Sequence, residues 1–235
     1  MPTDCHEHDI ANVGSVPVVD VDAPLQWIEV ATAAHTRLRV SLDARHARGE
    51  LDVTADSLLP GWSIGHVITH VTQSGDGHLR MLDAAARGEI GRQYPGGFEQ
   101  RESGINNGAR RPASEQLDDL RRGMDALQDR WMSMPTWSGS GASMGGDVAV
   151  VDLPFLRVRE VAIHHIDLGF DVTFDDLPET YLREELRQME SRWSARQPED
   201  MTTVPPAALA AAPPTRLAWL LGRTAIPGLD PAHIF

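Results

Sequence analysis

The sequence predicts a mainly α protein, a four-helix bundle with a small C-terminal segment. Long stretches place apolar residues three and four positions apart, as on the buried face of a helix. Residues that commonly begin helices precede these stretches, and 235 residues suffice for a sizeable core. We therefore expect a tail over residues 1–20, a four-helix bundle over 21–175 and a small C-terminal region over 176–235.

The first predicted helix begins at Asp22-Ala23-Pro24, because proline is favoured in the first helical turn. His35 falls on its apolar face, where a hydrogen-bonded core histidine is the more ordinary role. That face also carries Leu25, Ile28, Ala31, Leu38 and Leu42. We expect a long helix that forms one side of the bundle.

The second predicted helix follows a break at Pro60-Gly61, and Ser63 is suited to cap its N-terminus. Its apolar side chains continue until Gly88, a residue type that commonly ends helices. Between Gly88 and Arg111 the residues are mostly polar and follow no sustained period. We expect a long loop there.

The third predicted helix opens after Pro112, and its apolar residues step by three and four. The glycine-serine stretch 137–146 precedes Val148–Val151, which favours a strand or a short hairpin. These glycines lack the setting of a phosphate-binding loop, so nucleotide binding is rejected. Leu153-Pro154 then begins the fourth helix of the bundle.

The remaining chain is expected to leave the bundle. A fifth helix begins near Asp175–Pro178, and the sequence beyond Gln197 is rich in proline and alanine. A short amphipathic helix around Leu217–Leu221 ends at Gly222-Arg223, and residues 224–235 are expected to be irregular.

Composition limits the function classes. The formal charge of -13 opposes binding to nucleic acid or anionic lipid. No apolar run approaches the roughly 20 residues of a membrane-spanning helix, and the N-terminus lacks the pattern of a secretory signal. The single cysteine, Cys5, excludes an internal disulfide. We expect a cytoplasmic protein of undetermined oligomeric state.

The most informative spacing is that of Glu160 and His164, which lie one helical turn apart and therefore face the same way. A solvated charge ladder with Arg157 is the ordinary alternative. The second helix offers His66 in its first turn and His70 four residues later. Two histidines and one carboxylate would leave open positions on a bound metal, a pattern that indicates chemistry.

The segments Leu59–Val67 and Arg157–Gly169 together resemble the mycothiol-dependent maleylpyruvate isomerase and mycothiol S-transferase family of the DinB-like metal-binding superfamily. The matching motifs are Trp-x-x-x-His and Arg-Glu-x-x-x-His-x-x-Asp-Leu-Gly. The resemblance implies a DinB-like four-helix bundle that holds a divalent metal, usually zinc, through His66, Glu160 and His164. It also implies mycothiol as thiol cosubstrate.

The resemblance further implies a functional arginine in a C-terminal helix that ends Gly-Arg, which maps to Arg223. Arg216 is the fallback, and the alternative for either is a charge favoured at a helix end by the helix dipole. The chain departs from the isomerase pattern between Trp193 and Gly222, in a shorter stretch rich in proline and alanine.

Because of this departure, we rank S-transfer first among the expected functions. In S-transfer, mycothiol activated as a metal-bound thiolate would attack a small electrophile. Cis-trans isomerisation of maleylpyruvate is a close alternative, and a non-enzymatic DinB-like metal-binding protein is a further one. A generic metallohydrolase is disfavoured, because no separate base is evident beside the glutamate.

Overall fold

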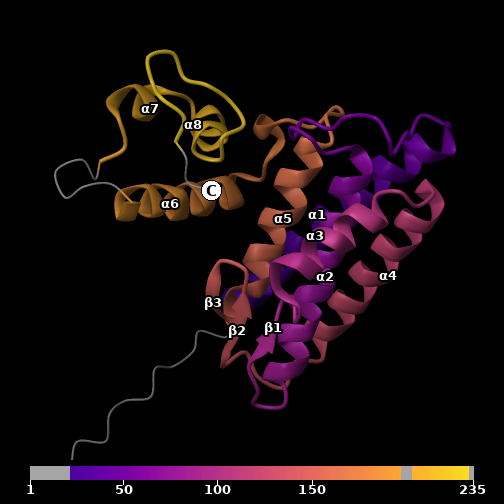
Figure 1. The fold of residues 1–235 in the computed structure, drawn as a ribbon. Helices are drawn as coiled ribbons and strands as arrows, with labels where there is room; N and C mark the ends of the chain where they lie inside the picture. The colour runs from indigo at the N-terminus through magenta and orange to yellow at the C-terminus, as the bar shows by residue number, and fades with distance from the viewer. Residues whose placement is uncertain (1–21, 197–202, 233–235) are drawn as a thin grey trace, which may run out of the picture.

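The computed structural model describes residues 22–196 and 203–232, and the predicted tail 1–20 lies outside them. The chain is mainly helical, and the expected four-helix bundle is confirmed. Figure 1 shows α1, α2, α4 and α5 side by side, with α6, α7 and α8 grouped beyond the end of α5. The helices are α1 Asp22–Ala47, α2 Ile64–Ala85, α3 Gly97–Gly108, α4 Ala113–Met132, α5 Leu153–Asp167, α6 Glu179–Arg196, α7 Pro206–Ala210 and α8 Pro213–Leu220.

The bundle core is built mainly where α2 packs on α4 and α1 packs on α5. Leu42 and Val67 are fully buried at its centre, together with side chains from α4 and α5. His35 is 3% exposed and accepts a hydrogen bond from Arg157 Nε at 2.9 Å. Its expected role as a hydrogen-bonded core histidine is confirmed.

The segment predicted as a long loop contains a strand and a helix, so that prediction is wrong. Within it, β1 (Gly91–Arg92) and α3 are ordered against α2. In α3 only Ile105 is buried, so the sequence has no repeating apolar pattern from which the helix could be predicted. The close approach depends on small residues, since a Cβ atom at Gly108 would clash with the branched side chain of Thr69 in α2.

The predicted hairpin is present as β2 (Ser140–Ser143) and β3 (Gly146–Ala149), which pair antiparallel. The strand β1 adds to β2 in parallel, with Gly91 opposite Gly141. The resulting three-stranded sheet lies against α2. It ties the chain between α2 and α3 to the chain between α4 and α5.

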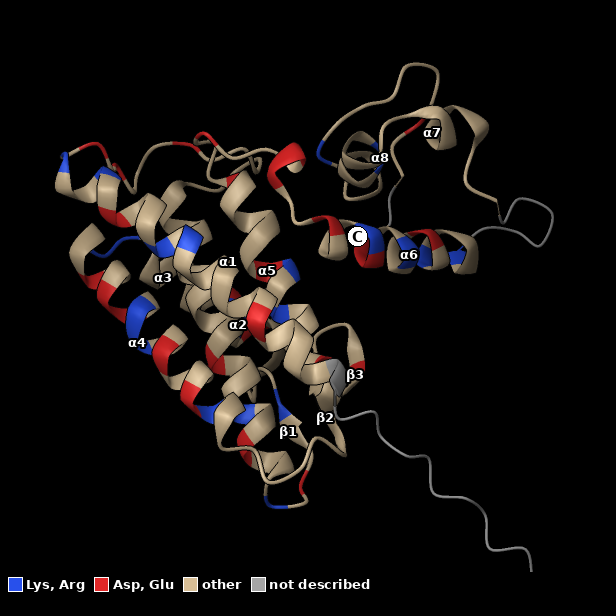
Figure 2. Cartoon of the chain, turned by 180° about the vertical axis from the view of Figure 1, so that it is seen from behind, with Lys and Arg blue, Asp and Glu red and all other residues tan. Residues whose placement is uncertain are grey.

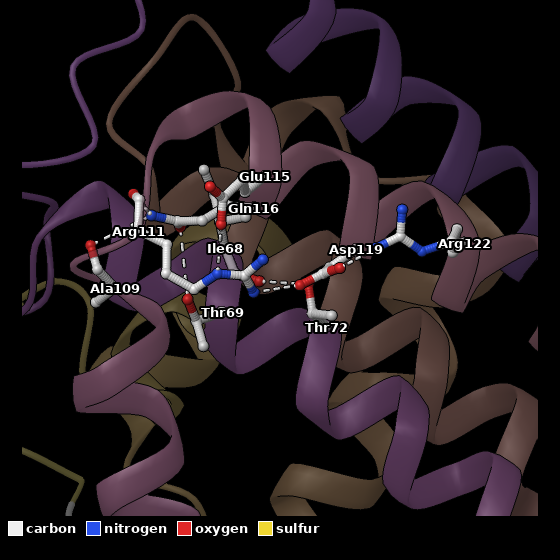
Figure 3. Close-up of polar contacts among 9 residues, drawn as sticks. All are labelled: Ile68, Thr69, Thr72, Ala109, Arg111, Glu115, Gln116, Asp119 and Arg122. Carbon is white, nitrogen blue, oxygen red and sulfur yellow. Dashed lines mark hydrogen bonds and ion pairs between the residues drawn. The ribbon is translucent and has the colours of Figure 1, made fainter.

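The connection from α3 to α4 is fixed by polar contacts, shown in Figure 3. Gln116 donates to the carbonyl oxygens of Ala109 at 3.2 Å and Arg111 at 2.8 Å. Arg111 in turn forms ion pairs with Glu115 and Asp119. A groove of about 620 Å³ runs beside these contacts between α2, α3 and α4. These ion pairs neutralise the arginine charge at its rim.

The C-terminal helices form their own small core, in which Met189 of α6 packs with Leu217 and Trp219 of α8. Ile163 of α5 belongs to the same cluster and joins it to the bundle. The short helix α7 was not predicted, since its sequence is only alanine, leucine and proline. Figure 2 shows acidic and basic residues interspersed along α4 and α6. No helix in the described part of the chain could span a membrane.

Candidate metal centre

Three potential metal-binding side chains meet between α2 and α5. They are His70, Glu160 and His164, whose candidate ligand atoms all lie within 4.8 Å of one another. His70 Nε2 is 3.1 Å from Glu160 Oε2. The rings of His70 and His164 meet edge to face, with centroids 4.6 Å apart. The spacing of four on α5 therefore does bring Glu160 and His164 together, as predicted.

His66 does not belong to this group, and the structure places His70 where His66 was expected. Ser63 caps α2 by accepting a hydrogen bond from His66 N, and His66 Nδ1 accepts one from Ser63 N at 3.1 Å. This reciprocal capping box turns the His66 ring toward the start of the helix. The signal was available in the sequence, because a serine precedes His66 by three residues.

The alternative of a solvated charge ladder is excluded by burial. Arg157 is 1% exposed. It donates one hydrogen bond to His35 at 2.9 Å and another to the carbonyl oxygen of Val71 at 2.8 Å. It therefore lies in the core of the bundle, away from water. The side chain of Glu160 is 27% exposed and that of His164 is 14% exposed.

Asp167 fixes the orientation of His164. Its Oδ2 atom is 2.8 Å from His164 Nδ1, and the aspartate is 1% exposed. A carboxylate accepts hydrogen bonds, so Nδ1 carries the proton and Nε2 keeps its lone pair for a ligand. This arrangement is the usual support for a histidine that binds a metal through Nε2.

The protonation states also suit a metal. Burial lowers the pKa of His70, which keeps its imidazole neutral at neutral pH. Burial would by itself raise the pKa of Glu160, but the hydrogen bond from His70 and the nearby His164 imidazole hold that pKa well below its usual range. A neutral imidazole and an ionised carboxylate are the forms that bind a cation. The residues present therefore fit a divalent metal such as zinc.

Arg223, the predicted functional arginine, reaches this centre from the C-terminal region. Its Nε and Nη2 atoms are each 2.9 Å from an oxygen of Asp167, and its Nη1 donates to Leu221 O at 2.8 Å. Arg216 lies elsewhere, with its Nε 3.4 Å from a carboxylate oxygen of Glu190 in α6. Of the two candidates, the structure brings only Arg223 to the centre.

The family profile described as the mycothiol maleylpyruvate isomerase N-terminal domain matches residues 26–169 of the sequence. The chain belongs to this family. The fold is similar to the crystal structure of the mycothiol-dependent maleylpyruvate isomerase, with a TM-score of 0.71, 23% identity, and coverage of 88% of this chain and 90% of that chain. A histidine-to-alanine mutant of that enzyme matches equally well. Among curated proteins, none matches the chain by sequence.

The family-matched range contains all three residues of the candidate centre, whereas Arg223 lies outside it. A cavity of about 290 Å³ opens beside the centre and is lined from both parts of the chain. The backbone N–H of Leu58 donates to the carbonyl oxygen of Asp167 at 2.8 Å, which holds the connection between α1 and α2 beside α5. The lining residues are Leu59, Trp62, His70, Arg101, Arg159, Glu160, Ile163, His164, Leu221 and Arg223.

Two lining arginines were not predicted as site residues. Arg159 of α5 donates from Nε to Glu185 at 2.6 Å and from Nη2 to Gln188 at 2.9 Å, so it also fastens α6 to the bundle. Arg101 comes from α3, in the segment predicted as a loop. Because no helix was predicted in this segment, the spacing of its residues could not connect Arg101 to a site.

Proposed function

We propose that this chain is a metal-dependent enzyme that activates mycothiol for attack on a small electrophile, with S-transfer as its reaction. One observation carries the proposal: the candidate ligand atoms of His70, Glu160 and His164 converge beside a cavity of about 290 Å³. Membership of a family named for a mycothiol-dependent isomerase supports the choice of thiol.

A divalent cation held by this centre would lower the pKa of a thiol, ordinarily about 8.5, so that sulfur reacts as the thiolate at neutral pH. The protein residues supply the geometry. His164 is oriented by Asp167, and Glu160 contributes the negative charge of the ligand set. Trp62 lies edge to face with His70, with ring centroids 5.4 Å apart, and covers that side of the centre.

In S-transfer, the thiol proton passes to solvent, sulfur forms a bond to the electrophilic carbon, and the leaving group departs with its electron pair. Arg223 has two donors bound to Asp167 and one to Leu221. Its main role is therefore to hold the C-terminal wall of the cavity against the centre. Its remaining N–H groups are available to polarise the electrophile.

Isomerisation of maleylpyruvate is the second candidate, favoured by the likeness in fold over 90% of the isomerase chain. There sulfur would add to the activated double bond, the resulting single bond would rotate, and elimination would return the thiol. The first step is common to both reactions. They differ in whether sulfur stays in the product.

The experiment is to incubate zinc-loaded protein with mycothiol and a panel of electrophiles that includes maleylpyruvate, and to determine product masses. Retained sulfur indicates S-transfer, and an unchanged mass with altered geometry indicates isomerisation. The same protein treated with a chelator, and the His70→Ala variant, are the controls. Bound zinc without any thiol-dependent turnover would contradict the proposal and indicate a non-enzymatic metal-binding protein.

A further inference from the structure

Arg101 differs from the other two arginines of the cavity in its partners. Arg159 is paired with Glu185, and Arg223 is paired with Asp167. Arg101 has no carboxylate partner among the described residues. Its guanidinium lies 6.0 Å from the centroid of the Trp62 ring, and its Nη2 atom is 3.4 Å from His70 Nδ1. Among the described residues, Arg101 is thus the arginine of the cavity lining that forms no ion pair.

The contact between Arg101 and His70 cannot persist when His70 binds a cation. His70 Nε2 faces Glu160, so it is the nitrogen available to a metal, and a neutral ring must then carry its proton on Nδ1. A guanidinium has only donors and cannot accept a hydrogen bond from that proton. His164 differs, because its Nδ1 faces the acceptor Asp167. A cation bound by His70 would thus free the Arg101 Nη2 donor that contacts Nδ1.

The phenol next to Arg101 is neutral. Tyr94, 6% exposed, lies beside Arg101, whose guanidinium is its hydrogen-bonding neighbour. Burial raises the pKa of Tyr94 to about 12, so the phenol stays neutral and adds no negative charge. Arg101 itself comes from α3, whose backbone is held against α2. A guanidinium that forms no ion pair and lies beside a candidate metal centre is suited to recognise a carboxylate.

We propose that Arg101 is the specificity-determining residue that binds a carboxylate group of the electrophile, so that this enzyme prefers anionic electrophiles over neutral ones. The inference rests on the proposed function and adds the substrate class to it. The guanidinium shares its cavity with the ligand atoms of His70 and Glu160. A carboxylate held by Arg101 would thus place the rest of a small molecule next to the sulfur.

The test compares Arg101→Gln with the wild type, using maleate as an anionic probe and its dimethyl ester as a neutral one. Zinc content is measured first, and probe affinity is then measured by calorimetry on the zinc-loaded proteins. We expect Arg101→Gln to bind maleate about tenfold more weakly or worse, since a hydrogen bond to a charged group has about that effect. Zinc content and the affinity for the ester should stay unchanged. Arg101→Lys should recover part of the loss.

Arg122→Gln is the matched control, because it removes one arginine charge from α4, outside this cavity, where the side chain is 71% exposed. It should bind maleate as the wild type does. Equal losses in both variants, unchanged maleate affinity in Arg101→Gln, or no maleate binding by the wild type would each overturn the proposal. A loss explained entirely by lower zinc content would also overturn it. Missing thiol turnover with intact Arg101-dependent binding would instead refute only the proposed reaction.

Discussion

Arg223 and Asp167 form a two-point ion pair that links the C-terminal region to α5, with both N···O distances at 2.9 Å. The same carboxylate also holds His164 Nδ1 at 2.8 Å. One buried aspartate thus orients a candidate metal ligand and anchors the wall of the cavity. Metal affinity and the position of the C-terminal region should therefore both depend on Asp167.

Asp167→Asn tests this dependence. The amide removes the negative charge that supports the His164 Nδ1 proton and the Arg223 guanidinium. We expect zinc affinity to fall by about 10- to 100-fold, as for other residues that support metal ligands. Competition with a chromophoric chelator measures it. Asp171→Asn, which alters a 95% exposed partner of Arg45, should have no such effect. An unchanged affinity in Asp167→Asn would contradict the coupling.

His70→Ala and His66→Ala form a second matched pair. Both remove one imidazole from α2, but only His70 lies with Glu160 and His164. We expect His70→Ala to lose stoichiometric zinc while keeping its helical circular dichroism. His66→Ala should retain zinc and lose about 1 kcal/mol of unfolding free energy with part of the capping box. The assignment of His70 fails if the metal contents of the two variants are reversed.

Arg223→Ala is expected to keep bound zinc and to lower kcat/KM for thiol transfer by about tenfold or more, because its charge-assisted contacts position the cavity wall. Steady-state kinetics and metal analysis on the same preparation check both parts. Arg216→Ala removes an arginine that pairs with Glu190 and does not line the cavity. If Arg216→Ala reduced turnover while Arg223→Ala did not, the predicted arginine would be wrong.

His78 should make stability depend on pH. Burial, followed by the charge of Arg157, lowers its pKa to about 4 in the folded protein, against an ordinary value of 6.5. The unfolded chain therefore binds more protons at mildly acidic pH, and stability present above pH 6.5 is lost as the pH falls toward 4. For His78 alone we expect about 2 kcal/mol to be lost between pH 7 and pH 5.

Urea unfolding at the two pH values measures this loss. The His78→Gln variant should show a correspondingly smaller dependence on pH, whereas His46→Gln, at an exposed position, should keep the wild-type dependence. Equal pH dependence in the wild type and His78→Gln would show that His78 is not the source.

The bundle could be predicted because its helices have strong local signals. Ser63 caps α2, proline stands at the start of α5, and buried residues of α4 such as Leu117 and Trp131 follow the helical period. The helix α3 lacked such a signal. Its place depends on contacts with α2 that glycines permit, and contacts between distant segments leave no periodic trace in the sequence.

The candidate site could be predicted in part for a related reason. Glu160 and His164 share one helix, so their spacing fixes their common direction. His66 and His70 share a helix stripe as well, and spacing cannot decide which of them faces α5. The capping contact of His66 decides it. Arg101 required knowledge of how α3 packs on α2.

The candidate metal centre and one wall of its cavity lie in separate stretches of the chain. The candidate ligands His70, Glu160 and His164 lie within residues 70–164, whereas Leu221 and Arg223 line one side of the cavity. Exchanging the final segment would therefore alter which molecules enter while preserving the reactive core, provided that an arginine still meets Asp167. A library randomised around Leu221, screened for binding of other small molecules, is the natural starting point for redirecting this scaffold.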